Sequence, residues 1–293
     1  MTRTAYLAAE GFEAELEREL GEIEARHERL FVAPGPPRPA AWAQNVWHDP
    51  ERLAIASIND AARQLKARQR NWAFYPTALH RRGALIVDAL PHVSQKPIAP
   101  YSPLPAAPLG SFTLIDRDTL LASARCESPF AHGEVRFLDD REGPPSRAYL
   151  KLWEVFTLRG EWPRPNERAI DLGSAPGGWT WVLAERGARV VSVDKAELDP
   201  RVAAMPNVEH RKESAFAIEP FEVDWWCSDI ICYPTRALVL VERWRPYARK
   251  MVCTLKFQGE TDHATAAAFA AIEGSRLVHL SHNRHELTWT VGL

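Results

Sequence analysis

The spacing of hydrophobic residues changes near position 147. Beyond it, short apolar runs alternate with stretches whose apolar positions recur at helical spacing. This pattern predicts helices over 147–158, 178–187, 235–248 and 262–273, and strands over 168–172, 189–193, 207–210, 224–229, 250–256, 277–282 and 286–292. Helices between strands in this way are typical of a mostly parallel sheet. The last two strands are close together in sequence, so one of them is expected to run antiparallel.

The first 125 residues follow a less regular pattern. Their apolar spacing predicts a strand over 4–8, a helix over 12–30, a helix over 50–70, a strand over 84–90, and two paired strands, "SFTLIDRD" and "TLLASA". A proline-rich segment over 96–108 separates these parts and is not expected to form regular structure. The elements together predict a smaller α+β domain.

Turn-forming residues are concentrated in "CESPFAHGEVRFLDDREGPPS", at 126–146. We therefore expect a domain over 1–125, a linker over 126–146 and a larger α/β domain over 147–293. The chain has 293 residues, of which 46% are hydrophobic, enough for each domain to bury a core. No apolar run approaches the ~18 residues of a membrane span. The first residues turn acidic where a signal peptide needs an apolar core, so we expect a cytoplasmic protein.

Charge is distributed unevenly, although the net charge is only −2. Residues 61–82 contain no acid and six cations: Arg63, Lys66, Arg68, Arg70, Arg81 and Arg82. Trp72, Phe74 and Tyr75 lie among them. Such a mixture can neutralise phosphates and stack on unpaired bases, which favours an RNA-binding surface. The other interpretation is a solvated helix face followed by aromatic residues that face a core, and the pattern leaves both open.

The strongest candidate for chemistry is "RAIDLGSAPGGWTW", at 168–181. It ends a predicted strand and opens a predicted helix, which is where ligands bind in open α/β sheets. Its glycines have the spacing G-x-x-x-G-G, whereas dinucleotide sites use G-x-G-x-x-G. Pro176 also removes an N–H that a pyrophosphate-binding turn would use. The loop therefore argues against a dinucleotide.

An acid at the end of the next strand completes this candidate site. Asp194 follows "RVVSV" and can accept hydrogen bonds from both hydroxyls of a ribose. A site for an adenosine-like ligand without a pyrophosphate fits S-adenosylmethionine, with its aminoacyl end near Asp171. The alternative is a structural strand–turn–helix whose terminal acid is incidental.

Several segments in a fixed order carry a resemblance to a known family. They are "SRAYLKLWEVF" (146–156), "DLGSAPGGW" (171–179), "WWCSDI" (225–230), "TLKFQGE" (254–260) and "NRHELTWTV" (283–291). Together they resemble the FtsJ-like 2′-O-ribose RNA methyltransferases, and most of all the branch that modifies a cytidine of bacterial large-subunit ribosomal RNA. The resemblance covers 128–293 and is weak before that. It implies a Rossmann-like S-adenosylmethionine-dependent methyltransferase fold. It also implies an RNA partner, and among RNAs it favours ribosomal RNA.

The resemblance also implies a catalytic set of two lysines and two acids, which maps onto Lys151, Asp229, Lys256 and Glu286. A ribose 2′-OH is a poor nucleophile until its proton leaves, and a neutral amine can take that proton. The resemblance points to Lys256 as the base and to Lys151 as the neighbouring cation. Carboxylates beside a lysine favour its charged form and burial opposes this, so the sequence leaves open whether a strong base or positioning alone drives transfer.

Cofactor contacts are expected from the glycine loop and the strand ends around it. The predicted set is Asp171, Gly173, Ser174, Pro176, Gly177, Gly178, Trp179, Asp194 and Glu213. Glu213 stands in "EHRKESAF", where the family commonly has an Asp that contacts the adenine amino group. Trp181 is expected to serve in helix packing, and Trp225 and Trp226 are expected to lie in the core.

Three hypotheses of function follow. The first is an S-adenosylmethionine-dependent RNA 2′-O-ribose methyltransferase with an RNA-recruiting domain over 1–125. The second is a methyltransferase of the same fold that acts on a small molecule or a protein and has no use for the basic segment. The third is a non-catalytic RNA-binding protein with a vestigial cofactor site. The complete set of lysines and acids favours the first.

Overall fold

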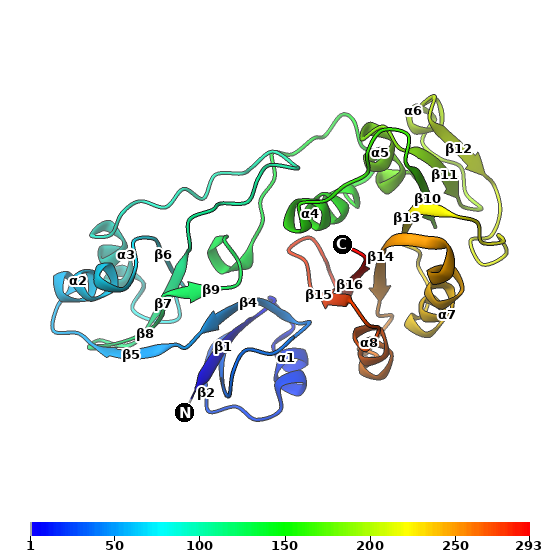
Figure 1. Ribbon diagram of the computed structural model, residues 1–293. Helices are drawn as coiled ribbons and strands as arrows, with labels where there is room; N and C mark the ends of the chain where they lie inside the picture. Colours follow the sequence, from blue (N-terminus) through cyan, green and yellow to red (C-terminus); the bar gives the residue numbers. More distant parts are fainter. Residues whose placement is uncertain (1) are drawn as a thin grey trace. The chain divides into compact units, whose positions relative to one another are not determined.

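The computed structural model describes residues 2–293 and divides the chain into two compact units (Figure 1). Unit 1 comprises the described residues up to Ile98 together with Leu104–Arg136. Unit 2 comprises Ala99–Pro103 and Phe137–Leu293. The passage 126–146 is therefore divided between the two units. Among the described residues, no helix is long and apolar enough to cross a membrane.

Unit 1 contains two sheets. The first has the order β2-β3-β1-β4-β9 and only antiparallel pairs. Its strands are β1 Arg3–Ala8, β2 Ala25–His27, β3 Leu30–Pro34, β4 Ala43–His48 and β9 Arg125–Cys126. Helix α1, Glu13–Leu20, follows β1 and ends at Gly21, whose φ of 72° is left-handed and unfavourable for other residues. The helix expected over 12–30 is thus shorter, and its second half forms β2 and part of β3.

The second sheet of unit 1 has the order β5-β8-β7-β6. Its strands are β5 Glu51–Ala54, β6 Trp72–Phe74, β7 Gly110–Asp116 and β8 Thr119–Ser123, and its helices are α2 Ile58–Arg68 and α3 His80–Asp88. The pairing of β7 with β8 confirms the two adjacent strands expected there. Residues 50–70 form a strand and then a helix, because the Ser57 side chain accepts a hydrogen bond from the Asp60 N–H and caps α2 at that point.

The strand expected over 84–90 is wrong, since α3 covers most of this range. A continuous apolar run does not distinguish a strand from a helix. In the structure Ile86 and Leu90 are buried while Leu85 and Val87 are exposed, which is helical burial. Gly83 fixes the contact: a Cβ there would lie 2.0 Å from a ring carbon of Phe74. The helix therefore packs closely on β6.

Unit 2 is built on a seven-stranded sheet with the order β12-β11-β10-β13-β14-β16-β15. The strands are β10 Arg168–Leu172, β11 Arg189–Val193, β12 Val208–Arg211, β13 Val223–Ser228, β14 Ala248–Lys256, β15 Ser275–Val278 and β16 Glu286–Val291. β16 is antiparallel to both of its neighbours, and the first five strands pair in parallel. The expected sheet with one antiparallel strand near the C-terminus is confirmed.

Helices cover both faces of this sheet (Figure 1). They are α4 Tyr149–Arg159, α5 Gly178–Glu185, α6 Pro200–Ala203, α7 Pro234–Trp244 and α8 His263–Ala270, with short 3₁₀ turns η1 Ala131–Gly133 in unit 1 and η2 Arg245–Tyr247 in unit 2. Trp225 and Trp226 are fully buried on β13, as expected. Burial is also continuous along α4 from Tyr149 to Thr157, so even its charged residues face the interior.

Candidate active site

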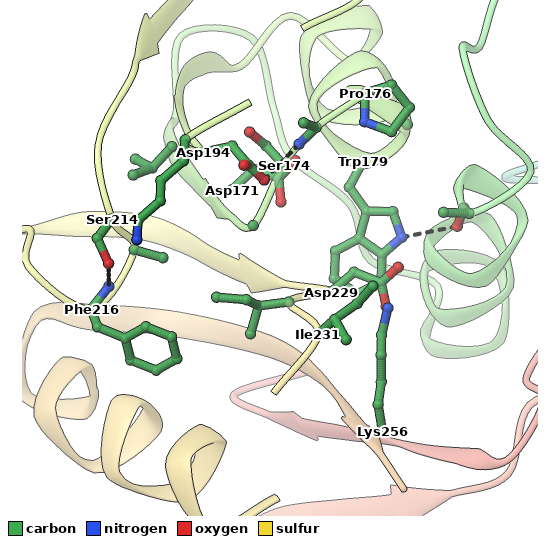
Figure 2. Close-up of a pocket in the computed structure, with 18 of the residues that line it drawn as sticks. Asp171, Ser174, Pro176, Trp179, Asp194, Ser214, Phe216, Asp229, Ile231 and Lys256 are labelled. Atoms are coloured by element: carbon green, nitrogen blue, oxygen red, sulfur yellow. Dashed lines mark hydrogen bonds and ion pairs between the residues drawn. The ribbon is translucent and has the colours of Figure 1, made fainter. Parts of the chain in front are cut away.

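The carboxyl ends of the parallel strands border a cavity of about 520 Å³ in unit 2. Figure 2 shows Asp171, Ser174 and Asp194 on one side of it and Asp229 and Lys256 on the other. These residues come from different strands, but parallel strands end at one edge and bring them together. The predicted cofactor residues and the predicted catalytic residues therefore meet at this edge.

The glycine loop forms one wall of the cavity. Gly173 and Gly178 both line it. A Cβ on Gly173 would lie 2.7 Å from the Cβ of Ile230, and one on Gly178 would lie 2.5 Å from Ser146 Oγ. Gly177 has a φ of 111° and caps α5, a conformation that L side chains rarely adopt. The glycines therefore allow close packing around the cavity, and larger residues would disturb it.

Asp171 carries the most perturbed carboxyl group on this wall. Its side chain is fully buried, Oδ2 accepts a 2.7 Å hydrogen bond from Thr180 Oγ1, and Oδ1 has no hydrogen-bond partner among the described residues. Burial raises the pKa of Asp171 to about 7, with a smaller contribution in the same direction from the charge of Asp229. A buried acceptor without a partner is costly and is expected to be satisfied by a bound donor.

Asp194 lies directly after β11, as expected. Its Oδ2 accepts a 3.1 Å hydrogen bond from the Ala175 N–H in the glycine loop, and its Oδ1 accepts a 2.9 Å bond from the Ala196 N–H. These bonds hold the carboxylate at the edge of the cavity, which it lines together with Glu213. The side chain is thereby oriented for a ligand that offers hydroxyl donors.

Other predicted cofactor residues have mixed surroundings. Ser174 and Pro176 line the cavity, and Ser174 Oγ accepts a hydrogen bond from Ser192 Oγ at 2.7 Å. Trp179 also lines it, but its indole N–H donates to the Ala148 carbonyl oxygen at 2.9 Å, so this tryptophan ties the start of α4 to the glycine loop. Trp181 packs against Tyr149 and Trp153, which agrees with its expected role in packing.

Several lining residues were not predicted from the sequence, and Ser146 and Phe216 are two of them. Ser146 Oγ is buried and without a partner among the described residues, like Asp171 Oδ1. Phe216 places an aromatic ring in the cavity wall (Figure 2). The guanidinium of Arg236 lies 4.1 Å from the centroid of this ring. Phe216 follows Glu213 closely in sequence, but no periodic pattern marks it.

The two lysines and two acids lie in direct contact. Lys151 Nζ is 2.6 Å from Asp229 Oδ1 and 3.1 Å from Glu286 Oε1, and Lys256 Nζ is 3.1 Å from the same Asp229 oxygen. Lys256 and Glu286 are direct register partners on β14 and β16. Only 8% of the Lys151 side chain is exposed, against 19% for Lys256, which also lines the cavity. Lys256 is thus the more accessible amine.

A buried clamp that the sequence analysis missed fixes the segment before Glu286. Glu154, one turn after Lys151 on α4, accepts hydrogen bonds from the N–H groups of Ser281 and His282 and from His282 Nδ1 at 2.6 Å. The side chain of Glu154 is buried. Since Lys151 and Glu154 share one helix, the clamp sets α4 and the β15–β16 connection in a fixed relation. In the sequence, Glu154 is only an acid at helical spacing from Lys151, and this spacing does not predict a contact with residues 281 and 282.

The basic segment of unit 1 has a divided outcome. Trp72 and Tyr75 are buried and Phe74 stacks on Phe112 within a core, so the interpretation in which these rings face a core is the correct one. Among the cations, Arg63 pairs with Asp60 and Arg68 with Glu51. Arg82 is half-buried, and the other five cations are exposed: Arg63, Lys66, Arg68, Arg70 and Arg81. Their contact with RNA stays a prediction.

The fold and this edge define a class of protein. A mostly parallel seven-stranded sheet with one antiparallel strand, a glycine loop after β10 and an acid after β11 form a Rossmann-like methyltransferase fold. The expected fold class is therefore confirmed.

Comparison with known proteins agrees with this class. Residues 144–241 match the FtsJ-like methyltransferase family, which confirms the resemblance for that segment. Ribosomal RNA large subunit methyltransferase M of Halorhodospira halophila is 39% identical over 49% of this chain and 46% of its own length. The protein of that name from Chromohalobacter salexigens is 34% identical over the same shares. The matched segments thus span about half the length of these relatives.

A solved structure is similar over half of the chain. Magnesium protoporphyrin IX methyltransferase from Synechocystis PCC 6803, determined with bound S-adenosylmethionine, has a TM-score of 0.38 and 12% identity over 50% of this chain and 78% of its own. The family match itself ends at residue 241, before Lys256 and Glu286.

Proposed function

We propose that this protein is an S-adenosylmethionine-dependent methyltransferase that modifies a ribose 2′-OH of RNA, with large-subunit ribosomal RNA as its substrate. The observation that carries the proposal is the contact of Lys151, Asp229, Lys256 and Glu286 beside the glycine-loop cavity. The FtsJ-like family match and the names of the relatives support the reaction and the substrate class.

The cavity residues fit the methyl donor. Asp194 is oriented to accept hydrogen bonds from ribose hydroxyls. The orphaned Asp171 Oδ1 suits an ammonium group, and the orphaned Ser146 hydroxyl, which also lines the cavity, suits a carboxylate. Phe216 and Glu213 line the region expected for the adenine. When bound, S-adenosylmethionine supplies an electrophilic methyl group on its sulfonium.

The four charged residues divide the work on the acceptor. Lys256 is the amine that reaches the cavity, so in its neutral form it takes the proton of the 2′-OH as that oxygen bonds to the methyl carbon and the bond from that carbon to sulfur breaks. Asp229 contacts both lysines through one oxygen and orients them. Lys151 lies deeper and pairs with both Asp229 and Glu286, which offsets part of their negative charge. With these groups fixed by two strands and a buried helix, positioning contributes to the rate alongside proton transfer.

The test is labelled methyl transfer to total RNA from a strain that lacks the gene, followed by mapping of alkali-resistant linkages. Wild-type protein is expected to label large-subunit ribosomal RNA at a ribose. Lys256→Ala is expected to lower transfer by about 10²- to 10⁴-fold, because the proton acceptor is removed, while S-adenosylmethionine still binds.

A matched control is Lys250→Ala on the same strand, since Lys250 pairs with Glu161 and contacts Trp225 away from the cavity. It is expected to keep transfer. Incorporation into protein or a small molecule instead of RNA contradicts the proposed substrate. Transfer that survives in Lys256→Ala contradicts the role of this lysine.

A further inference from the structure

The segment that follows Asp229 exposes two large apolar side chains, and the first of them lines the cavity. Ile231 is 77% exposed and Tyr233 is 61% exposed, in a short connection between β13 and α7. Ile231 lines the cavity together with Asp229 and Lys256, and Figure 2 shows it next to Asp229. Exposed apolar groups gathered next to a reactive site are typical of a contact surface for a ligand.

The connection is held rigidly although its side chains are exposed. Cys232, between the two, is buried and directs Ile231 and Tyr233 away from the core. Ile230 packs against Gly173 so closely that a Cβ there would overlap it. This contact joins the connection to the glycine loop.

The start of α7 fixes the other end of the connection. The Tyr233 carbonyl oxygen accepts hydrogen bonds from the N–H groups of Arg236 and Ala237, and Pro234 occupies the first turn. The tyrosine backbone is therefore set before any ligand arrives. A rigid aromatic residue gives up little conformational freedom when it binds.

We propose that Ile231 and Tyr233 form the platform on which the base of the acceptor nucleotide stacks, so that the substrate is an unpaired nucleotide of RNA. The inference rests on the proposed function and adds how the acceptor is held. The platform begins two residues after Asp229, so a base on it places its ribose toward Asp229 and Lys256. The base and the methyl donor are then aligned by one rigid unit, through the contact of Ile230 with Gly173.

The chemistry of the platform fits a single nucleotide. A base has two flat apolar faces, and aromatic side chains stack on them whatever the base. A ribose within a regular duplex does not place its base on a protein side chain, so the nucleotide must be unpaired or turned out. Arg236, which lines the same cavity one turn into α7, supplies a positive charge for the adjoining phosphate.

The test measures transfer kinetics with an unmodified large-subunit ribosomal RNA transcript and the full-length protein. Tyr233→Ala is expected to raise the KM for RNA about 10- to 100-fold, because the base no longer has a ring to stack on. Its Kd for S-adenosylmethionine is expected to stay within about twofold of wild type, since Tyr233 is not among the residues that line the cavity. Tyr233→Phe is expected to restore the wild-type KM, because the ring and not the hydroxyl carries the interaction.

Tyr247→Ala is the matched control. Tyr247 is also an exposed tyrosine of unit 2, at 39%, but it precedes the first residue of β14 and so lies at the opposite edge of the sheet from Lys256. Its KM for RNA is expected to equal that of wild type. A wild-type protein that transfers no methyl group to RNA overturns the proposed function and the platform with it. If the wild-type protein transfers methyl groups to RNA and Tyr233→Ala has the same KM for RNA, the platform alone is overturned.

Discussion

The two units treat charged side chains in opposite ways. Four charged residues are buried among residues 2–293, and all of them lie in unit 2: Lys151, Glu154, Asp171 and Glu286. The buried polar residues of unit 1 are neutral: Thr4, Asn45, Ser111, Thr113 and Ser123. Its ion pairs, such as Arg68 with Glu51, are exposed.

This difference indicates that the buried charges of unit 2 serve its function and not its stability. A buried ion costs several kcal/mol in hydration, which its partner only partly offsets. A fold that needs only stability satisfies its core with apolar groups, as unit 1 does around Leu65 and Phe112. Unit 2 keeps buried charges at one edge of its sheet, where the cavity opens. We therefore expect removal of charge to have large effects at that edge and small effects on unit 1.

The largest effect on stability is expected from Glu154→Ala. The substitution leaves the N–H groups of Ser281 and His282 without their acceptor inside the protein and removes the interaction with the His282 ring. Breaking such a buried network costs about 3–5 kcal/mol of unfolding free energy, which urea denaturation measures. Transfer is also expected to fall, because the connection that leads to Glu286 is released.

Glu154→Gln tests whether hydrogen bonding carries both effects, since its amide oxygen can still accept a hydrogen bond and should recover part of both losses. The control is Glu209→Ala, which removes an exposed ion pair with Arg211 in the same unit and should change stability by less than about 0.5 kcal/mol. Equal losses in Glu209→Ala and Glu154→Ala would remove the distinction between buried and exposed charge.

A pH-dependent effect is expected from Asp171→Asn. Burial raises the pKa of Asp171 from 3.8 to about 7, so between these values the folded protein keeps a proton that the unfolded chain has released. The free energy of unfolding therefore falls as the pH rises from 4 to 7 and is level above that. The asparagine variant lacks this decrease, so at pH 8 it is expected to be more stable than wild type by on the order of 4 kcal/mol.

The same variant is expected to bind S-adenosylmethionine more weakly, because a neutral amide replaces the carboxylate that faces the ammonium group. For wild type, affinity should increase as the pH rises through 7. Unfolding curves at pH 5 and pH 8, with titration of S-adenosylmethionine by calorimetry, check both effects. Identical pH dependence in wild type and variant would show that Asp171 is ionised throughout.

The sequence predicts the elements of unit 2 more accurately than those of unit 1. In unit 2 the pattern located β10 and β11 to the residue, since each apolar run is bounded by turn residues and alternates with a helix. In unit 1 the run at 84–90 has no such context. Whether it forms a strand or a helix depends on Gly83 meeting Phe74, a contact that local spacing does not record.

The site shows the same limit. Asp194, Asp229 and Lys256 follow or end apolar strands, so parallel topology alone brings them to one edge. Lys151 is on a helix, and only the resemblance to the family predicted its place beside Asp229. The local pattern could not identify three further residues, because their roles depend on their surroundings in three dimensions. Glu154 contacts a connection 127 residues later, Ser146 lies in the cavity wall, and Tyr233 is exposed.

The smallest effect on stability is expected in unit 1, from Lys66→Glu combined with Arg70→Glu. Both side chains are exposed, so the free energy of unfolding should change by less than about 0.5 kcal/mol for each. If these cations neutralise phosphates, the slope of log K against log salt for RNA binding should fall by about 2, one for each cation removed. Arg3→Glu with Arg18→Glu, on β1 and α1, reverses the same charge elsewhere in unit 1 and should leave the slope unchanged. If neither pair of substitutions alters the slope, the cations of the basic segment are only solvated and do not contact RNA. RNA recruitment would then have to come from unit 2.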